Sequence, residues 1–182
     1  MDNIKKTIPF YFKGSKVTLA ALEKEDMPIV AKWINDEEIN YYNGSRFPSS
    51  LDEQYSWFEK IKNDKTKKKL VIYTKADKKA GMVTLFNIDH RNQKAEIGVY
   101  ISVEYQGKGL AKESLMLLVN YAFQELNMHK IYASILSFNT ASIKLFESVG
   151  FKREYIKKED VFTNGNFVDT EILSLFKRDL SK

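Results

Sequence analysis

Two glycines and two lysines stand together in Gln106–Lys112, directly before a leucine-rich run that favours a helix. A strand, a glycine-bearing loop and a helix in this order bring unpaired backbone N–H groups to the positive end of the helix dipole. Gly107 and Gly109 allow a ligand to approach the backbone closely, and Lys108 and Lys112 add positive charge at the rim. The segment is therefore a candidate phosphate site, although the same glycines are also typical of a connector that only turns the chain.

A second block of interest is Asn139–Phe151, in which Asn139 precedes a segment of helical spacing that ends at Gly150 and Phe151. Together with Gln106–Ala111, which fits a pyrophosphate loop, this block resembles the GNAT family of N-acetyltransferases. Nearly the whole chain shares the resemblance, which is to the branch of ribosomal-protein N-terminal, spermidine and amino-sugar acetyltransferases. It implies a mixed α/β fold, with a mostly antiparallel central sheet flanked by helices. It also implies acetyl-CoA as the cosubstrate, without a metal ion.

The resemblance assigns residues to acetyl-CoA binding. In the family, backbone N–H groups polarise the acetyl carbonyl where two central strands splay apart, which here means Ile101–Val103. The following loop grips the pantetheine and the phosphates, and Asn139 bonds the cofactor, assisted by Ser142, whose alternative role is close helix packing. The implied cofactor-binding residues are Ile101, Ser102, Val103, Gln106, Gly107, Lys108, Gly109, Leu110, Ala111, Lys112, Asn139, Ser142 and Phe146.

The reaction that the resemblance implies is attack of an amine on a thioester. A primary alkylammonium has a pKa of about 10.4, so supplying the neutral amine at pH 7 costs roughly 4 kcal/mol and favours a base nearby. Glu96 lies in the strand before the phosphate loop, where relatives often carry a carboxylate that acts through water. We expect Glu96 to be the catalytic base. Its alternative role is that of a structural carboxylate on a half-buried strand.

Phe146 departs from the family pattern, because many relatives carry a tyrosine there that protonates the departing thiolate. A phenylalanine cannot donate a proton. Either another group or water then protonates the thiolate, or the thiolate leaves unprotonated. The same departure keeps a second hypothesis open, in which the protein is a non-catalytic acetyl-CoA sensor or a partner module.

The acceptor amine is less well specified than the acetyl donor, because relatives share a cofactor site and differ in what they acetylate. In the family, the region corresponding to Asp36–Ser50 borders the acceptor, and here Tyr41, Tyr42 and Arg46 would shape it. A polyamine acceptor predicts that Asp36–Glu38 face the cleft. A protein N-terminus predicts an open groove, and a nucleotide-linked amino sugar predicts that Arg46 and nearby lysines bind phosphate.

Hydrophobic periodicity and turn residues predict the elements that must position these residues. Ser50 with Glu53 forms a capping box for the second helix, and Asn164-Gly165 suits a tight hairpin turn between the last two strands. The predicted elements are a strand at Lys16–Leu22, a helix from Asp26 toward Asn40, a loop at Asn40–Ser50, a helix at Leu51–Asn63, strands at Lys68–Lys75, Ala80–Asp89 and Lys94–Ser102, a helix at Ala111–Leu126, a strand at Lys130–Leu136, a helix at Asn139–Val149 and the final hairpin.

Composition limits the remaining possibilities. The 182 residues, 43% of them hydrophobic, are enough for one domain spanning 1–182, and no apolar run is long enough for a membrane span. The absence of cysteine excludes disulfides and thiolate chemistry and fits a reducing cytoplasm, and two histidines disfavour hydrolase triads and metal sites. A net charge of +5 includes a lysine cluster at 65–79, interpreted as a solvated strand edge. No nucleic-acid signature accompanies it, and a homo-oligomer remains open.

Overall fold

The fold is built on a mostly antiparallel sheet, seen here in a computed structural model that describes residues 10–43 and 47–180. Eight strands of this part of the chain lie in the order β1-β2-β3-β4-β5-β6-β8-β7, and only β5 and β6 run parallel. The strands are β1 (Phe10–Lys13), β2 (Val17–Ala21), β3 (Lys68–Thr74), β4 (Lys79–Asp89), β5 (Lys94–Ile101), β6 (Lys130–Leu136), β7 (Lys152–Thr163) and β8 (Asn166–Phe176). The mixed fold that the sequence predicts is confirmed.

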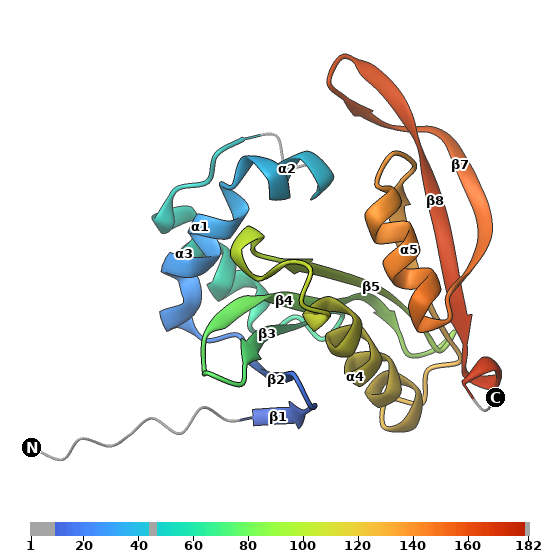
Figure 1. Ribbon diagram of the computed structural model, residues 1–182, viewed down its shortest axis with the longest axis horizontal. Coiled ribbons are helices and arrows are strands. Elements are labelled where there is room, and N and C mark those ends of the chain that lie inside the picture. The colour runs from blue at the N-terminus through green and yellow to red at the C-terminus, as the bar shows by residue number, and fades with distance from the viewer. Residues whose placement is uncertain (1–9, 44–46, 181–182) are drawn as a thin grey trace, which may run out of the picture.

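Helices cover both faces of the sheet, with α1 and α3 on one side of the central strands and α4 on the other (Figure 1). They are α1 (Met27–Ile34), α2 (Glu37–Asn43), α3 (Leu51–Ile61), α4 (Leu110–Gln124) and α5 (Thr140–Val149), with short 3₁₀ turns at Lys24–Asp26, Val103–Tyr105 and Lys177–Asp179. No helix within residues 10–43 and 47–180 has the length and apolar character needed to cross a membrane.

The covering helices explain why the central strands are apolar on both faces. In β2, Leu19 packs into the core beneath α4, whereas its neighbour Ala20 packs into the core beneath α1 and α3. Ile72 and Val71 divide in the same way in the adjacent β3. Successive side chains of a strand point to opposite faces, so burial on both faces requires a continuous apolar run rather than an alternating one.

The predicted helix from Asp26 toward Asn40 is wrong as one element, because the chain breaks it into α1 and α2. The Asn35 side chain exchanges two hydrogen bonds of 2.8 Å with the backbone of Ser49, which fixes it outside the helix. The Asp36 carboxylate accepts a hydrogen bond from the Ile39 N–H at 3.1 Å and caps the start of α2. Helix α2 then runs to Asn43, so the predicted loop begins later than expected.

Strand β1 was not predicted, because its four residues are too short to show a periodic pattern. A distant carboxylate fixes the turn that follows it. Glu113 in the first turn of α4 accepts hydrogen bonds from the N–H groups of Ser15, Lys16 and Val17 at 2.6–2.8 Å, and from the Ser15 hydroxyl at 2.6 Å. Partial burial alone would raise the pKa of Glu113, but these hydrogen bonds hold it below its ordinary value. The start of α4 is thereby anchored to the sheet edge.

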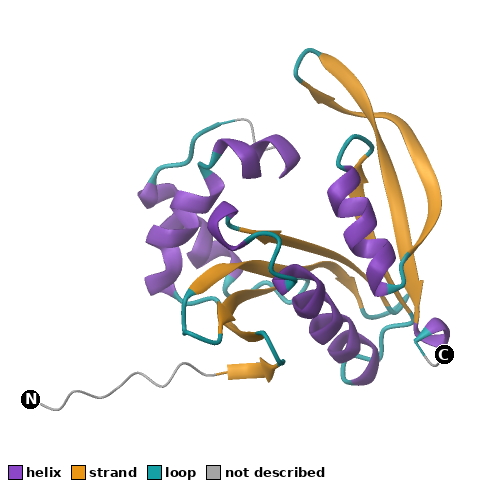
Figure 2. Ribbon diagram, in the orientation of Figure 1, coloured by secondary structure: helices purple, strands orange, loops and turns teal. Residues whose placement is uncertain are grey.

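The local signals for helix and hairpin ends are confirmed. Ser50 and Glu53 form both hydrogen bonds of a capping box at α3, and Gly150 ends α5 in the left-handed region at φ 108°. Asn164 and Gly165, at φ 49° and 79°, make the turn of the β7–β8 hairpin. Figure 2 shows the two long strands of this hairpin extending beyond α5.

Candidate active site

The central feature of the site is a divergence of the two parallel strands. β5 and β6 pair only between Lys94–Glu96 and Lys130–Tyr132. Beyond these residues β5 stays paired with β4 as far as Ile101, while β6 stays paired with β8 as far as Leu136. The two strands therefore separate, and a cleft of about 890 Å³ lies at the point of separation.

The cleft brings together most of the residues singled out from the sequence. Its lining includes Tyr42, Glu96, Ile101, Gln106, Gly107, Gly109, Leu110, Ala111, Lys112, Asn139, Ser142 and Phe146. Four other predicted residues do not line it, namely Tyr41, Ser102, Val103 and Lys108. Arg46 lies outside the described residues. Residues of α2, β5, the α4 loop, α4 and α5 thus meet at one place, as a two-substrate reaction requires.

The N-terminus of α4 opens onto the cleft without a side-chain cap. Ser50 and Asn139 cap α3 and α5 with side-chain oxygens, whereas Gly109 caps α4 in the left-handed region at φ 78° and has no side chain to offer. The first N–H groups of α4 therefore have no capping acceptor in the described chain and can bind an anion. A Cβ added at Gly107 would meet nothing within 4 Å, so the loop has room for a ligand. These features fit a coenzyme A pyrophosphate.

Two side chains of this loop fold back onto it. The Gln106 amide donates a hydrogen bond to the Ile101 carbonyl at 3.3 Å, which ties the loop to the end of β5. The Lys108 ammonium donates to the Glu104 carbonyl at 2.8 Å and lies 4.9 Å from the centroid of the Tyr105 ring. Lys108 therefore closes its own loop rather than reaching into the cleft, and Lys112 is the lysine that lines it.

The backbone at the end of β5 presents only part of the predicted donor set. The Ser102 N–H donates to the Ala80 carbonyl at 2.8 Å, so the prediction that it polarises a bound carbonyl does not hold in this arrangement. N–H groups alternate sides along a strand, and the Ile101 N–H accordingly points away from β4 toward the separation from β6. Ile101 is the residue of this segment that both lines the cleft and offers its backbone to it.

Glu96 lies on β5 at the last position before the separation. Its carboxylate accepts a hydrogen bond from the Asn87 side chain at 3.0 Å. Asn87 has φ 47° at an irregularity of β4, and such bulges re-aim side chains beside functional sites. Tyr132 stands opposite Glu96 on β6, and burial together with the Glu96 charge raises the pKa of the Tyr132 phenol. Glu96 thus lines the cleft with Asn87 hydrogen-bonded to its carboxylate and Tyr132 opposite it on β6.

The α5 side of the cleft carries a polar cap and an apolar ring. The Asn139 side-chain oxygen accepts a hydrogen bond from the Ser142 N–H at 3.0 Å, so this oxygen is already used in capping the helix. Phe146 is only 2% exposed, and its ring packs edge-on against Phe151 with 5.1 Å between centroids. The ring lines the cleft and places no proton donor there.

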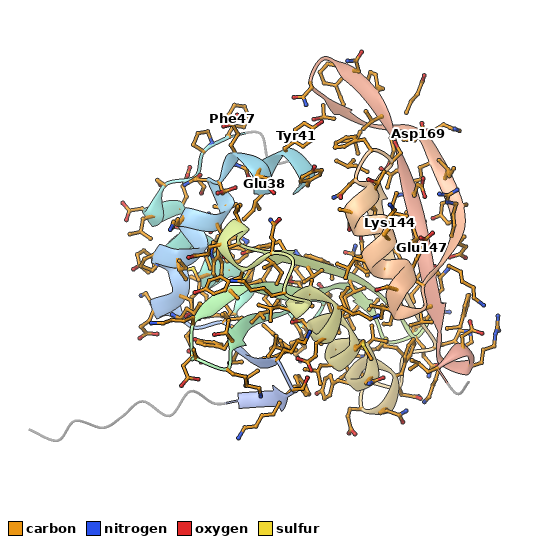
Figure 3. All side chains as sticks on the ribbon, in the orientation of Figure 1. Glu38, Tyr41, Phe47, Lys144, Glu147 and Asp169 are labelled. Atoms are coloured by element: carbon orange, nitrogen blue, oxygen red, sulfur yellow. The ribbon has the colours of Figure 1, made fainter. Side chains whose placement is uncertain are left out.

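The outer part of the cleft lies between α2 and the β7–β8 hairpin. Glu38 lines it from α2, whereas Asp160 and Thr170 line it from the hairpin. In Figure 3, Glu38 and Tyr41 lie across from the hairpin strand that carries Asp169, while Lys144 and Glu147 mark the side of α5 turned away from α2. The ring centroids of Tyr41 and Tyr42 lie 5.2 and 6.2 Å from that of Phe138, with the rings tilted. Helix α2 therefore contacts the loop before α5.

Sequence reasoning missed four residues of the site: Asn87, Tyr132, Asp160 and Thr170. Asn87 and Asp160 lie at strand irregularities, where extra residues change which way the side chains point, and no local pattern marks these positions. Tyr132 could have been found, because it sits in a recognisable strand whose pairing with the strand of Glu96 follows from the fold.

Comparisons with known proteins identify the family. Residues 16–152 match the family described as "Acetyltransferase (GNAT) domain". A spermidine N(1)-acetyltransferase of Vibrio cholerae is 31% identical over 158 residues, which cover 87% of this chain and 91% of that protein. The crystal structure of spermidine N-acetyltransferase from V. cholerae in complex with CoA and spermine superposes with a TM-score of 0.88 at 28% identity, covering 93% of this chain and 100% of that one.

A dodecameric structure of the same Vibrio enzyme in an intermediate state superposes with a TM-score of 0.81 at 28% identity, over 92% of this chain and 97% of that one. The family match over residues 16–152 includes the separated strands, the α4 loop and α5, which contribute to the cleft. The chain belongs to the GNAT acetyltransferase family, and its reaction is transfer of the acetyl group of acetyl-CoA to a primary amine.

Proposed function

We propose that the acceptor is a small polycationic amine of the polyamine class. The observation that carries this proposal is the charge of the cleft wall. Glu38, Glu96 and Asp160 line it, and among the described residues Lys112, in the first turn of α4, is the one basic residue of the lining. A cleft lined by one sign of charge concentrates ligands of the opposite sign. Asp36 and Glu37 do not take part, since Asp36 caps α2 and neither residue lines the cleft.

The same wall disfavours the other two acceptors. A nucleotide-linked amino sugar carries phosphates, and three carboxylates would repel them. A protein N-terminus carries one positive charge, which would use only part of the acidic wall. The Vibrio relative whose structure holds spermine supports a polyamine by analogy.

We assign Glu96 as the base that removes a proton from the acceptor ammonium, through water. Asn87 orients its carboxylate through the 3.0 Å hydrogen bond, and the half-buried position limits competition from bulk solvent. A base next to the amine offsets part of the roughly 4 kcal/mol that deprotonation costs at pH 7. The freed amine then attacks the thioester carbonyl carbon, and the C–S bond breaks.

Backbone and loop groups carry the remaining steps of the proposal. The Ile101 N–H stabilises the negative charge that develops on the carbonyl oxygen, and the N-terminus of α4 holds the phosphates. The coenzyme A thiolate leaves without a phenol beside it, because Phe146 replaces the usual proton donor. Direct attack of the amine requires no metal ion.

We further propose that residues 1–182 form one domain and that the protein assembles as a homo-oligomer. We also propose that the enzyme works in the cytoplasm, because the absence of cysteine favours a reducing compartment. The dodecameric Vibrio structure supports the assembly by analogy.

Thiol release from acetyl-CoA across a panel of amines tests the acceptor class. Spermidine and spermine should be turned over with higher kcat/KM than a peptide with a free N-terminus or an amino sugar. The variant that tests the acidic wall is Glu38→Gln. It should raise the KM for spermidine about five-fold or more, while the KM for acetyl-CoA, which serves as the internal control, stays unchanged. A peptide or an amino sugar as the best substrate would contradict the proposal.

A further inference from the structure

The β7–β8 hairpin brings Asp160 and Thr170 to the outer part of the cleft. Asp160 lies at an irregularity of β7, where residues 158–160 stand opposite Asp169 alone on β8. Extra residues of this kind interrupt the ladder, bend the strand and re-aim its side chains, and they are common beside functional sites. We call residues 158–160 the β7 bulge. The side chain that this bulge presents to the cleft is that of Asp160.

The carboxylate of Asp169 holds the β7 bulge in its conformation. It accepts a hydrogen bond from the Glu159 N–H at 2.9 Å and pairs with the Lys158 ammonium at 2.8 Å. Glu159 has φ 50°, a conformation that a residue other than glycine keeps only where its surroundings fix it. The Lys158 ammonium, together with the Glu159 N–H, holds the pKa of Asp169 below its ordinary value. Asp169 thereby fixes the backbone from which Asp160 projects.

The Asp160 carboxylate is free to bind a cation in the cleft. Its ion pair with Lys157 spans 3.8 Å, which is too long for a hydrogen bond, and Lys157 does not line the cleft. Glu38 lines the cleft from α2, and Figure 3 shows it across from the hairpin strand that carries Asp169. One carboxylate from each wall therefore borders the outer part of the cleft.

Thr170 provides an independent indication of a ligand at this place. The residue lines the cleft and is only 3% exposed, and its hydroxyl has no hydrogen-bond partner among the described residues. Buried polar groups normally have a partner, because leaving one unpaired costs free energy. The N–H groups of a bound ammonium would give the Thr170 hydroxyl a donor.

Thr170 and Glu96 lie on the same face of the sheet but at different levels. Glu96 pairs with Tyr132, and Thr170 pairs with Leu136, four residues further along β6. Paired residues of neighbouring strands share a face, as do residues an even number of positions apart on one strand. Four residues correspond to about 13 Å along the strand. The proposed base and Thr170 therefore lie at opposite ends of the acceptor side of the cleft.

We propose that Glu38, Asp160 and Thr170 form a subsite for the distal ammonium of the acceptor, and that Asp169 is the positioning residue that shapes this subsite through the β7 bulge. The inference rests on the polyamine function proposed above. It adds that the enzyme recognises a second positive charge at a set distance from the reacting amine. A long diamine fills both ends of the cleft, whereas a monoamine or a short diamine leaves the Thr170 hydroxyl unpaired and the two carboxylates without a cation.

Acceptors that differ at the distal end test the subsite. Diaminooctane carries a second ammonium, aminooctanol carries a hydroxyl in its place on a chain of the same length, and diaminopropane carries its second ammonium close to the first. The kcat/KM for diaminooctane should exceed that of each of the other two by about ten-fold or more. Equal kcat/KM for diaminooctane and aminooctanol, with spermidine still acetylated, would overturn the subsite and leave the proposed function intact. Failure to acetylate spermidine would overturn both.

Variants of the subsite separate recognition of the distal charge from general electrostatics. Asp160→Asn should raise the KM for diaminooctane about ten-fold, with kcat and the KM for aminooctanol nearly unchanged. Thr170→Val removes the unpaired hydroxyl, should stay folded, and should raise the same KM about three-fold. The matched control is Glu147→Gln, which removes an exposed carboxylate on the side of α5 turned away from α2 and should behave as the parent does. An equal rise of KM for both acceptors in Asp160→Asn, or no rise for either, would disprove the subsite.

Variants of Asp169 test the positioning role. Asp169→Ala removes the acceptor that holds the Glu159 N–H and should raise the KM for diaminooctane as Asp160→Asn does, again without a change for aminooctanol. Asp169→Asn keeps an oxygen that can accept from this N–H, so it should restore most of the affinity. Asp160 is exposed, so Asp160→Asn keeps the test valid if Asp169→Ala fails to fold. A folded Asp169→Ala with the KM of the parent would overturn the role of the bulge.

Discussion

Asn87 donates a hydrogen bond to the carboxylate of Glu96 at 3.0 Å, across two neighbouring strands and from a residue with φ 47°. The bulge that carries Asn87 therefore faces the carboxylate that we assign as the base. Backbone strain of this kind persists where the surrounding structure over-determines it, and it is common beside functional sites. The relationship makes Asn87 a positioning residue, which acts through Glu96 and does not touch the substrate.

Glu96→Gln should lower kcat mainly at low pH, where the acceptor ammonium holds its proton most firmly, with little change in acetyl-CoA affinity. Asn87→Gly removes the amide and keeps the backbone conformation, since glycine adopts positive φ freely. We expect it to reproduce the change of pH profile with a smaller loss, of about three- to ten-fold in kcat. Steady-state rates from pH 6 to 9 measure both effects. A pH profile identical to that of the parent in Glu96→Gln would return this carboxylate to a structural role.

Gly109→Val should abolish the thermal stabilisation that coenzyme A gives the parent protein. Gly109 has φ 78°, which a β-branched residue adopts only with strain, and an added Cβ would lie 2.9 Å from the Lys16 ammonium nitrogen. Both effects displace the N–H groups that we expect to hold the pyrophosphate. A ligand that binds only the folded state at about 100 times its Kd raises stability by about 2.7 kcal/mol, which is easily measured by scanning fluorimetry.

Gly165→Val is the matched control for this substitution. Gly165 has φ 79° in the hairpin turn and no atom within 4 Å of an added Cβ, so its backbone strain is similar and its place in the fold is remote. It should lose about 1–2 kcal/mol of stability and still respond to coenzyme A. NADH should stabilise neither protein. A full coenzyme A response in Gly109→Val would contradict the assignment of the loop.

Lys69→Met should be more stable than the parent at neutral pH. The pKa of Lys69 falls from 10.5 to about 8 in the folded protein because of burial and the nearby Lys67. Below pH 8 the folded state carries the buried charge at a cost. Between pH 8 and 10.5 the folded state releases a proton that the unfolded chain keeps, so the parent gains stability as the pH rises.

The gain of Lys69→Met should therefore be about 1–3 kcal/mol at pH 7 and shrink steadily as the pH approaches 10.5. Urea unfolding at several pH values measures it. Lys78 is exposed, so Lys78→Met should show no such trend. A constant gain at every pH would mean that packing rather than charge burial is responsible.

The parts of the fold that the sequence predicts are those encoded by residues close together in the chain. The capping box of Ser50 and Glu53 and the turn at Asn164-Gly165 depend on neighbours within four positions. Gly107 and Gly109 belong to the same class, because their left-handed backbone is a local requirement. Such signals need no knowledge of what packs against them.

The features that could not be predicted depend on partners distant in the chain. Glu113 meets Ser15 across 98 positions, and only the completed sheet brings them together. Lys69 lies in a cluster whose composition indicates a solvated edge, yet α3 and β4 enclose it between two aromatic rings. Asp160 enters the cleft because the register of β7 shifts between Lys157 and Val161, which no alternation of polar and apolar residues marks.

Phe146→Tyr tests whether the absent phenol limits turnover. The ring lines the cleft, so a hydroxyl at its tip would add a proton donor to a wall that offers none at this position. If protonation of the departing thiolate is limiting, kcat should rise while coenzyme A affinity stays nearly unchanged. General acid catalysis is worth about 10²- to 10⁴-fold, and a water already in place would reduce the gain toward the lower end.

The competing effect is burial of a hydroxyl without a partner, since Phe146 is 2% exposed and packs edge-on against Phe151. That would cost about 1–3 kcal/mol of stability and leave kcat unchanged. Phe151→Tyr is the matched control, because Phe151 is equally buried in the same core and does not line the cleft. It should lose stability without any gain in rate. If Phe146→Tyr binds coenzyme A normally, stays folded and turns over no faster, thiolate protonation is not the limiting step, and product release or another donor sets kcat.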